Sequence, residues 1–125
     1  MLDGVTSESL TLHLWSVLTE LIVVFHDGIA VLPLEVSGTQ FIGVDTAREL
    51  ETYRLVVWAK HGVLSTGKDY QDCFGLIGTA DKASHIALEL KSVSGKSISE
   101  NNVLLKADLK KICDVLGIEG KYLND

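Results

Sequence analysis

Histidine and cysteine are the residue types in this chain that are most typical of a zinc site, and six of them are spread along it. They are His13, His26, His61, Cys73, His85 and Cys113. Two ligands of one metal ion often lie only a few residues apart in sequence. No pair among these six has that spacing, so spacing alone predicts no metal site. Both cysteines lie in predicted helices, and we expect buried free thiols in a reducing cytoplasm.

His61 differs from the other histidines because it follows a strongly apolar segment, residues 54–59, and precedes Gly62. The apolar segment predicts a strand, and a glycine lets the backbone approach a ligand closely or adopt a positive φ. We therefore expect His61 in a tight turn at a strand end. A structural role and a functional role fit this placement about equally well. His26 in a predicted turn and His85 on a predicted helix are expected at or near the surface, without function.

Glu20 directly precedes a second apolar segment, residues 21–25, which is rich in β-branched side chains and predicts a strand. A carboxylate at this position would lie at the edge of a sheet and face solvent or a neighbouring subunit. From the residues alone, an ordinary solvated carboxylate is the simpler interpretation.

The rest of the pattern predicts strands that alternate with helices. The expected elements are a strand or irregular segment at 10–14, a buried hairpin of strands 21–25 and 29–32, a helix capped by Ser37 or Thr39 and ending near Thr52, strands at 54–59 and 63–65, a helix at 69–91 with Asp69 as its N-cap, a Gly/Ser linker at 92–97, and a helix from Ser99 to a stop at Gly117. This order predicts a layered α/β protein with a mixed or antiparallel sheet flanked by helices.

Length and composition narrow the class of protein. The 125 residues are expected to form a single region, and 46% of them are hydrophobic, which is typical of a folded chain. The net charge is −6 without a basic cluster, so nucleic acid is not an expected partner. The longest apolar stretch is too short to cross a membrane, and the N-terminus does not resemble a secretory signal. We therefore expect a cytoplasmic protein.

Two longer motifs carry a family resemblance. The segment LVVWAKHGVLSTG at 55–67, followed by FGLIGTADK at 74–82, is similar to the rhamnulose-1-phosphate aldolases of the class II aldolase and adducin superfamily. The segment ELIVVF at 20–25, with Asp27-Gly28, Leu32-Pro33 and Gly38-Thr39, extends the likeness over almost the whole chain. The resemblance covers only about the C-terminal half of the family's length, and implies part of a class II aldolase-like domain.

The resemblance implies a zinc-dependent lyase of rhamnose catabolism, a homotetramer that cleaves rhamnulose 1-phosphate to dihydroxyacetone phosphate and lactaldehyde. Three histidines hold the Zn²⁺ ion in that family, two from a His-x-His strand and one from the His-Gly turn that His61 matches. Zinc acts there as a Lewis acid on the ketone phosphate. Glu20 matches an acidic residue that the neighbouring subunit of a fourfold ring supplies. The expected metal ligand is thus His61, and the expected catalytic residue is Glu20.

This sequence contains no His-x-His, and the family's N-terminal glutamate and phosphate-binding loops have no counterpart in it. We therefore expect no aldolase activity from this chain alone. We also expect self-association or insolubility, because a partial domain exposes a sheet edge and apolar faces. The alternative is a non-catalytic assembly or interaction module, as superfamily members such as adducin imply. A pentulose-phosphate epimerase fits the motifs at 20–28 and 74–80 less well.

Overall fold

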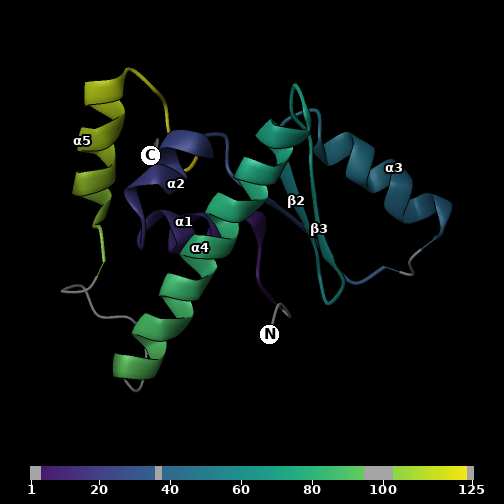
Figure 1. Cartoon of the computed structure of the whole chain (residues 1–125), viewed down its shortest axis with the longest axis horizontal. Helices are drawn as coiled ribbons and strands as arrows, with labels where there is room; N and C mark the ends of the chain where they lie inside the picture. The colour runs from purple at the N-terminus through teal and green to yellow at the C-terminus, as the bar shows by residue number, and fades with distance from the viewer. Residues whose placement is uncertain (1–3, 36–37, 95–102, 124–125) are drawn as a thin grey trace.

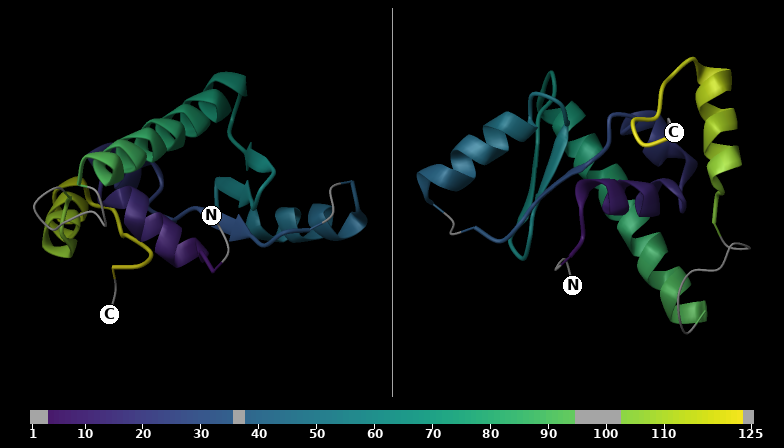
Figure 2. Two further views of the ribbon diagram at one scale, coloured as in Figure 1. Left: turned by 90° about the horizontal axis from the view of Figure 1, so that it is seen from below. Right: turned by 180° about the vertical axis from the view of Figure 1, so that it is seen from behind.

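The computed structural model of the chain describes residues 4–35, 38–94 and 103–123. Helices and a small sheet form two layers, with the longest helix on one side and the first helix, the sheet and the third helix on the other (Figures 1 and 2). The elements are α1 (Ser7–Trp15), α2 (Thr19–Val24), β1 (Ala30–Leu32), α3 (Gln40–Glu49), β2 (Leu55–Trp58), β3 (Gly62–Ser65), α4 (Tyr70–Ser94) and α5 (Lys106–Leu116). This arrangement confirms the predicted layered α/β class.

The sheet has the strand order β1-β2-β3 and is mixed, as predicted. β1 runs parallel to β2, with Ala30 opposite Val56, and β2 runs antiparallel to β3, with Val57 opposite Val63. β2 is the central strand, and its Leu55 and Val56 are fully buried. β3 follows β2 through a short turn, which confirms the predicted pair of strands around His61.

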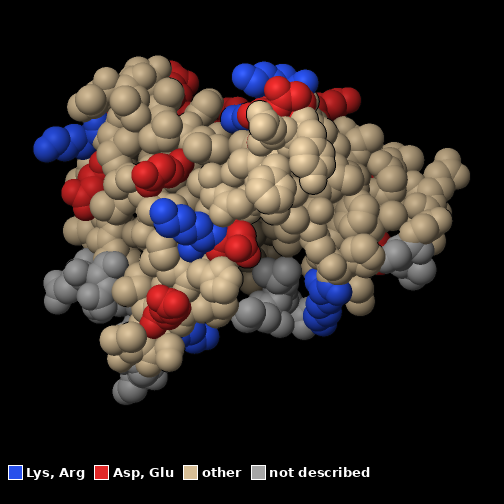
Figure 3. Space-filling view, in the orientation of Figure 1, with Lys and Arg blue, Asp and Glu red and all other residues tan. Residues whose placement is uncertain are grey.

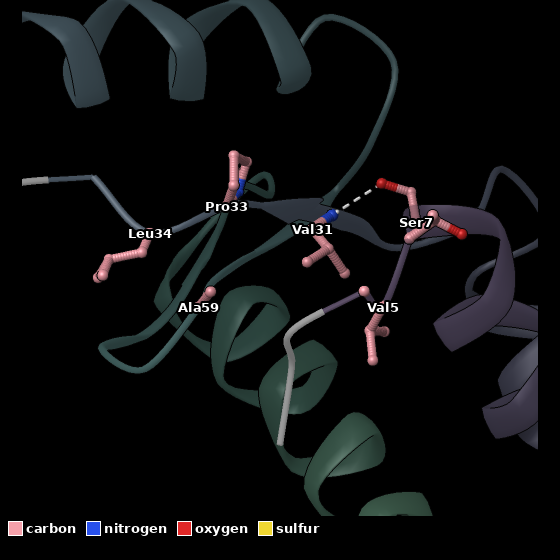
Figure 4. A pocket seen from close by; sticks show the side chains of 8 residues that line it. Val5, Ser7, Val31, Pro33, Leu34 and Ala59 are labelled. Carbon is pink, nitrogen blue, oxygen red and sulfur yellow. Dashed lines mark hydrogen bonds between the residues drawn. The ribbon is translucent and has the colours of Figure 1, made fainter.

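Helix α1 closes the outer edge of β1. Ser7 Oγ accepts a hydrogen bond from the Val31 N–H at 2.8 Å, which Figure 4 shows as a dashed line. Thr11 Oγ1 accepts from the Ile29 N–H at 2.9 Å and donates to the Ile29 carbonyl at 3.2 Å. Four residues of helix rise about 6 Å, close to the about 6.6 Å spanned by two strand residues. The two hydroxyls therefore match alternate backbone groups of β1, and Pro33 beyond them has no N–H to satisfy.

The segment at 10–14, predicted as a strand or irregular, is instead the interior of α1. Thr6 caps this helix: its hydroxyl accepts from the Ser9 N–H at 3.0 Å, and Ser9 Oγ in turn accepts from the Thr6 N–H at 2.9 Å. This reciprocal pair is a capping box. The sequence Thr-Ser-Glu-Ser at 6–9 is the signal that identifies the helix, and it outweighs the short alternation of apolar residues after it.

The predicted strand at 21–25 is also wrong, because residues 19–24 form the short helix α2, and no hairpin joins them to 29–32. Ile22, Val23 and Val24 are β-branched and favour a strand locally. In the fold, α2 packs against α1, α4 and α5 and buries Leu21 and Ile22 completely. Burial against three helices overrides the intrinsic preference of this short segment. The turn predicted at His26-Asp27 is present, and it connects α2 to β1.

The later helices largely follow the sequence pattern. Thr39 is the N-cap residue of α3 by its extended backbone, but its side chain makes no capping hydrogen bond. Asp69 Oδ1 accepts from the Asp72 N–H at 2.8 Å at the start of α4, and Gly117 ends α5 with φ 66°. Ser37, the other candidate cap, lies outside the described residues. The last helix begins at Lys106 rather than at Ser99, because 103–105 are not helical and 99–102 are not described. Residues 92–94 of the predicted linker belong to α4, and 95–97 are not described.

The C-terminal segment packs over the loop between α2 and β1 and is hydrogen-bonded to it. Gly28 has φ 95°, and its Cα faces the rings of Tyr53 and Tyr122, whose hydroxyls lie 2.8 Å apart. The Lys121 N–H donates to the His26 carbonyl at 2.9 Å. Burial, followed by the hydrogen bond with Tyr53, raises the pKa of Tyr122. These contacts fix the end of α2 relative to the sheet.

Charged side chains are scattered over the face shown in Figure 3, where lysines and arginines alternate with acidic residues and do not form a continuous basic patch. Among the described residues, no helix is both long enough and apolar enough to cross a membrane.

Candidate active site

His61 lies at the tip of the hairpin formed by β2 and β3. Its N–H donates to the Trp58 carbonyl at 3.0 Å, and Lys60 within the turn has φ 62°. The strand register pairs Trp58 with Gly62, so His61 has no partner across the hairpin. The predicted placement at a strand end is confirmed. The left-handed residue is Lys60, however, and the positive φ considered for Gly62 is not found.

The His61 side chain is exposed and touches one aromatic neighbour. Its ring lies edge-on to the Trp58 ring, with centroids 5.1 Å apart and an interplanar angle of 61°. Within the described part of the chain, neither ring nitrogen has a hydrogen-bond partner. A neutral imidazole nitrogen in this state is able to bind a metal ion or to transfer a proton.

Glu20 lies in the first turn of α2 and is exposed, so the predicted sheet-edge position is wrong. The Thr19 hydroxyl donates to Glu20 Oε2 at 3.1 Å. A carboxylate at this end of a helix interacts favourably with the helix dipole. Figure 1 places α2 and the β2–β3 turn on different sides of the molecule. A single copy of the chain therefore does not bring Glu20 and His61 together.

The remaining histidines and cysteines do not gather around His61. His26 pairs with Asp27 at 3.7 Å, and His85 pairs with Asp81 at 3.9 Å along the exposed face of α4. Both cysteines are free and helical as predicted, Cys113 buried and Cys73 half-buried. Across 4–35, 38–94 and 103–123, no three histidine, cysteine or acidic side chains are placed to hold a metal ion together. His61 suits zinc as a single imidazole ligand, and the described residues do not complete a zinc site.

A shallow cleft of about 440 Å³ lies beside the same turn (Figure 4). Its lining residues are Gly4, Val5, Thr6, Ser7, Val31, Pro33, Leu34 and Ala59. None of these side chains titrates, and Ala59 belongs to the turn that carries His61. The described residues of the cleft thus offer apolar surface and hydroxyl groups, and none of them is an acid, a base or a metal ligand.

Two polar arrangements were not indicated by the sequence pattern. Arg54 donates from Nη1 to the Val24 carbonyl at 3.2 Å and lies 3.6 Å from Asp72, so it joins the end of α2 to the start of α4. Glu35, on the loop before α3, hydrogen-bonds to Asp45, and this contact, with burial, raises the pKa of Glu35. Its Oε2 is buried and has no hydrogen-bond partner among the residues that the structure describes. Both arrangements join segments that are distant in sequence, which local patterns do not reveal.

Comparison with known proteins places this chain in a family. Residues 6–88 match the family described as class II aldolase and adducin N-terminal domain. The chain is 39% identical over 119 residues to the rhamnulose-1-phosphate aldolase of Enterococcus faecalis, which covers 92% of this chain and 40% of that protein. It is 46% identical over 87 residues to the enzyme of that name from Mannheimia succiniciproducens, which covers 70% of this chain and 32% of that protein. It is 35% identical over 122 residues to the one from Listeria monocytogenes, which covers 96% of this chain and 43% of that protein.

The chain thus spans between 32% and 43% of the length of these relatives. The matched region contains α1 to β3 and most of α4, and so includes both the hairpin with His61 and the helix with Glu20. The chain therefore belongs to the class II aldolase and adducin family.

Proposed function

We propose that this chain is part of a zinc-dependent class II aldolase that cleaves rhamnulose 1-phosphate to dihydroxyacetone phosphate and lactaldehyde. The observation that carries the proposal is the position of His61. It stands exposed at a hairpin tip, its ring nitrogens have no hydrogen-bond partner among the described residues, and it lies inside the region matched to the family.

In this proposal His61 provides one ligand to a zinc ion, and the other ligands come from residues outside this chain. Catalytic zinc sites usually have three protein ligands, so a lone imidazole does not suffice. Zinc in such a site supplies Lewis-acid polarisation of a carbonyl oxygen. We accordingly propose that the chain by itself does not cleave the sugar phosphate.

We propose that Glu20 transfers protons in the site of a neighbouring copy. Its carboxylate is exposed, and it lies on a different side of the molecule from the His61 turn (Figure 1). A general acid or base must come within hydrogen-bonding reach of the reacting group. A second copy in a homo-oligomer, which the family resemblance implies is a tetramer, would bring the two residues together.

Complementation tests the function directly. The chain is mixed with the complementary portion of a full-length relative and with zinc, and the release of dihydroxyacetone phosphate is measured. We expect each part alone to be inactive and the mixture to be active. His61→Ala should abolish the recovered activity, whereas His85→Ala, at an exposed position on α4, should retain it. Activity that survives His61→Ala would show that the metal-ligand assignment is wrong.

The role of Glu20 across subunits is tested by mixing two inactive variants. Assemblies of Glu20→Gln and of His61→Ala are prepared separately, dissociated and reassembled together. Some sites then combine an intact His61 from one copy with an intact Glu20 from the next, so activity should return. No recovery in demonstrably mixed oligomers would contradict the proposal. Assembly without zinc binding or cleavage in the wild-type mixture would favour the non-catalytic, adducin-like alternative.

A further inference from the structure

We propose that Trp58, held by Thr46, is a positioning residue that sets the direction of the His61 imidazole. As far as metal binding is concerned, this inference rests on the proposed function of His61. The contact between the two rings, with centroids 5.1 Å apart, is the first observation behind it. Within the described residues, the ring of His61 has no hydrogen bond, ion pair or second ring contact that would fix it.

Trp58 is itself fixed by a hydrogen bond to a different element. Its Nε1–H donates to Thr46 Oγ1 at 3.0 Å, and Thr46 lies on α3 with only 5% of its surface exposed. The Thr46 hydroxyl donates to the Ile42 carbonyl at 2.5 Å, one turn earlier in α3. Because the hydroxyl proton is used in this bond, a lone pair of the oxygen is available to accept the indole N–H. Trp58 therefore has a defined rotamer at the end of β2.

The backbone restrains the other end of His61. Its N–H donates to the Trp58 carbonyl, so the two residues are joined through the main chain as well as through their rings. An imidazole that binds a metal ion is usually oriented by a hydrogen bond from its second nitrogen. Here an edge-on aromatic contact takes that place, a geometry that aromatic rings favour. The orientation of His61 then depends on how α3 packs beside the sheet.

Nuclear magnetic resonance of the whole chain tests the orientation without any metal. The ring current of Trp58 should displace the His61 ring-proton resonances from those of the exposed His85, which serves as an internal reference. Thr46→Val removes the hydroxyl and should shift the His61 resonances towards those of His85, whereas Thr46→Ser keeps the hydroxyl and should preserve the wild-type shift. Trp58→Leu should abolish the displacement. An unchanged His61 spectrum in Thr46→Val would overturn the proposal.

Two controls separate orientation from folding. The amide spectrum of each variant shows whether the chain remains folded, and Trp58→Phe provides a second test if Thr46→Val does not fold. Trp58→Phe keeps an aromatic ring but loses the hydrogen bond to Thr46, so the displacement of the His61 resonances should decrease. A displacement that depends only on an aromatic ring at 58, and not on its hydrogen bond, would also overturn the proposal.

Zinc affinity in the complemented assembly provides a readout that does not depend on catalysis. Competition with a chelator should show about a tenfold or larger loss of zinc affinity in Thr46→Val and none in Thr46→Ser. Equal affinity of all three proteins would contradict the positioning role at the metal. If the wild-type assembly binds no zinc through His61, the proposed function fails, and the resonance measurements on the chain still decide whether Trp58 orients His61.

Discussion

The two outer strands of the sheet differ in what hydrogen-bonds to the backbone groups on their free edges. The N–H groups of Ile29, just before β1, and of Val31 within it donate to hydroxyls of α1, and Pro33 follows them. Among the described residues, none covers the free edge of β3 in this way. The bond from the Thr66 N–H to the Arg54 carbonyl fixes the antiparallel pairing, so the backbone groups of Val63 and Ser65 point away from β2. Within the described residues, nothing hydrogen-bonds to them.

This difference separates a closed side of the molecule from an open side. The closed side contains α1, α2 and β1, whose buried side chains include Trp15, Leu21 and Ala30. The open side contains β3 and the hairpin tip, where Val63 is 45% exposed and His61 is accessible. The expected exposure of a sheet edge thus applies to β3 and not to β1. Self-association of the chain through that edge stays a prediction.

Matched glycine substitutions should give the largest contrast between the two sides. Gly28→Ala would place a Cβ 3.0 Å from the Tyr122 ring and 3.1 Å from the Tyr53 ring, at a φ of 95°. Strain and overpacking together should lower the free energy of unfolding by about 2–5 kcal/mol. In Gly62→Ala on β3 the Cβ meets open space, and the change should stay within about 0.5 kcal/mol. Urea denaturation measures both, and comparable losses would refute the contrast.

Removing the hydroxyls of α1 that bond to the edge of β1 should change the free energy of unfolding by a smaller amount. Thr11→Val leaves the N–H and the carbonyl of Ile29 buried without their partner, so unfolding should become easier by about 2–4 kcal/mol. Ser7→Ala removes one part-buried bond and should cost about 1 kcal/mol. The control is Thr79→Val on α4, whose hydroxyl only bonds to the Gly75 carbonyl of its own helix. If amide exchange at Ile29 does not accelerate in Thr11→Val, α1 does not close the β1 edge.

The smallest expected effect is a difference in thiol reactivity between the two cysteines. Burial raises the pKa of the Cys113 thiol, so less of the reactive thiolate forms at a given pH. Cys73 is half-buried in the first turn of α4 and accepts a bond at its carbonyl from Ser65 on β3. Alkylation followed by peptide mass spectrometry should therefore modify Cys73 before Cys113. Faster modification of Cys113 would mean that the contact between α5 and α2 opens readily.

The same pKa determines a dependence of stability on pH. The thiol of Cys113 ionises at lower pH in the unfolded chain than in the folded one, because folding raises its pKa. Its contribution to stability is complete below the unfolded value, about 8.5, and is lost as the pH rises through the folded value. Cys113→Ala should reduce this decline in the free energy of unfolding at alkaline pH.

The sequence was most informative where a local pattern has a single physical meaning. The β2–β3 hairpin, helix α3 with Thr39, helix α4 with Asp69 and the stop at Gly117 were predicted because caps, turns and periodicity act between neighbouring residues. His61 at the hairpin tip belongs to this group. The hydroxyls of α1 that close β1, and the bond from Trp58 to Thr46, join distant segments and left no such local signal.

The sequence by itself determined the class of fold, the turn that carries His61 and the family resemblance. Only the tertiary structure decided that residues 19–24 are a helix, because an apolar β-branched run suits a buried strand or a buried helix and its packing partners select between them. Because this segment is a helix, Glu20 lies at a helix end and not at the sheet edge that its sequence predicts. Tertiary structure also decided that Glu20 and His61 lie apart, since only the packing of α2 against three helices fixes where its first turn lies.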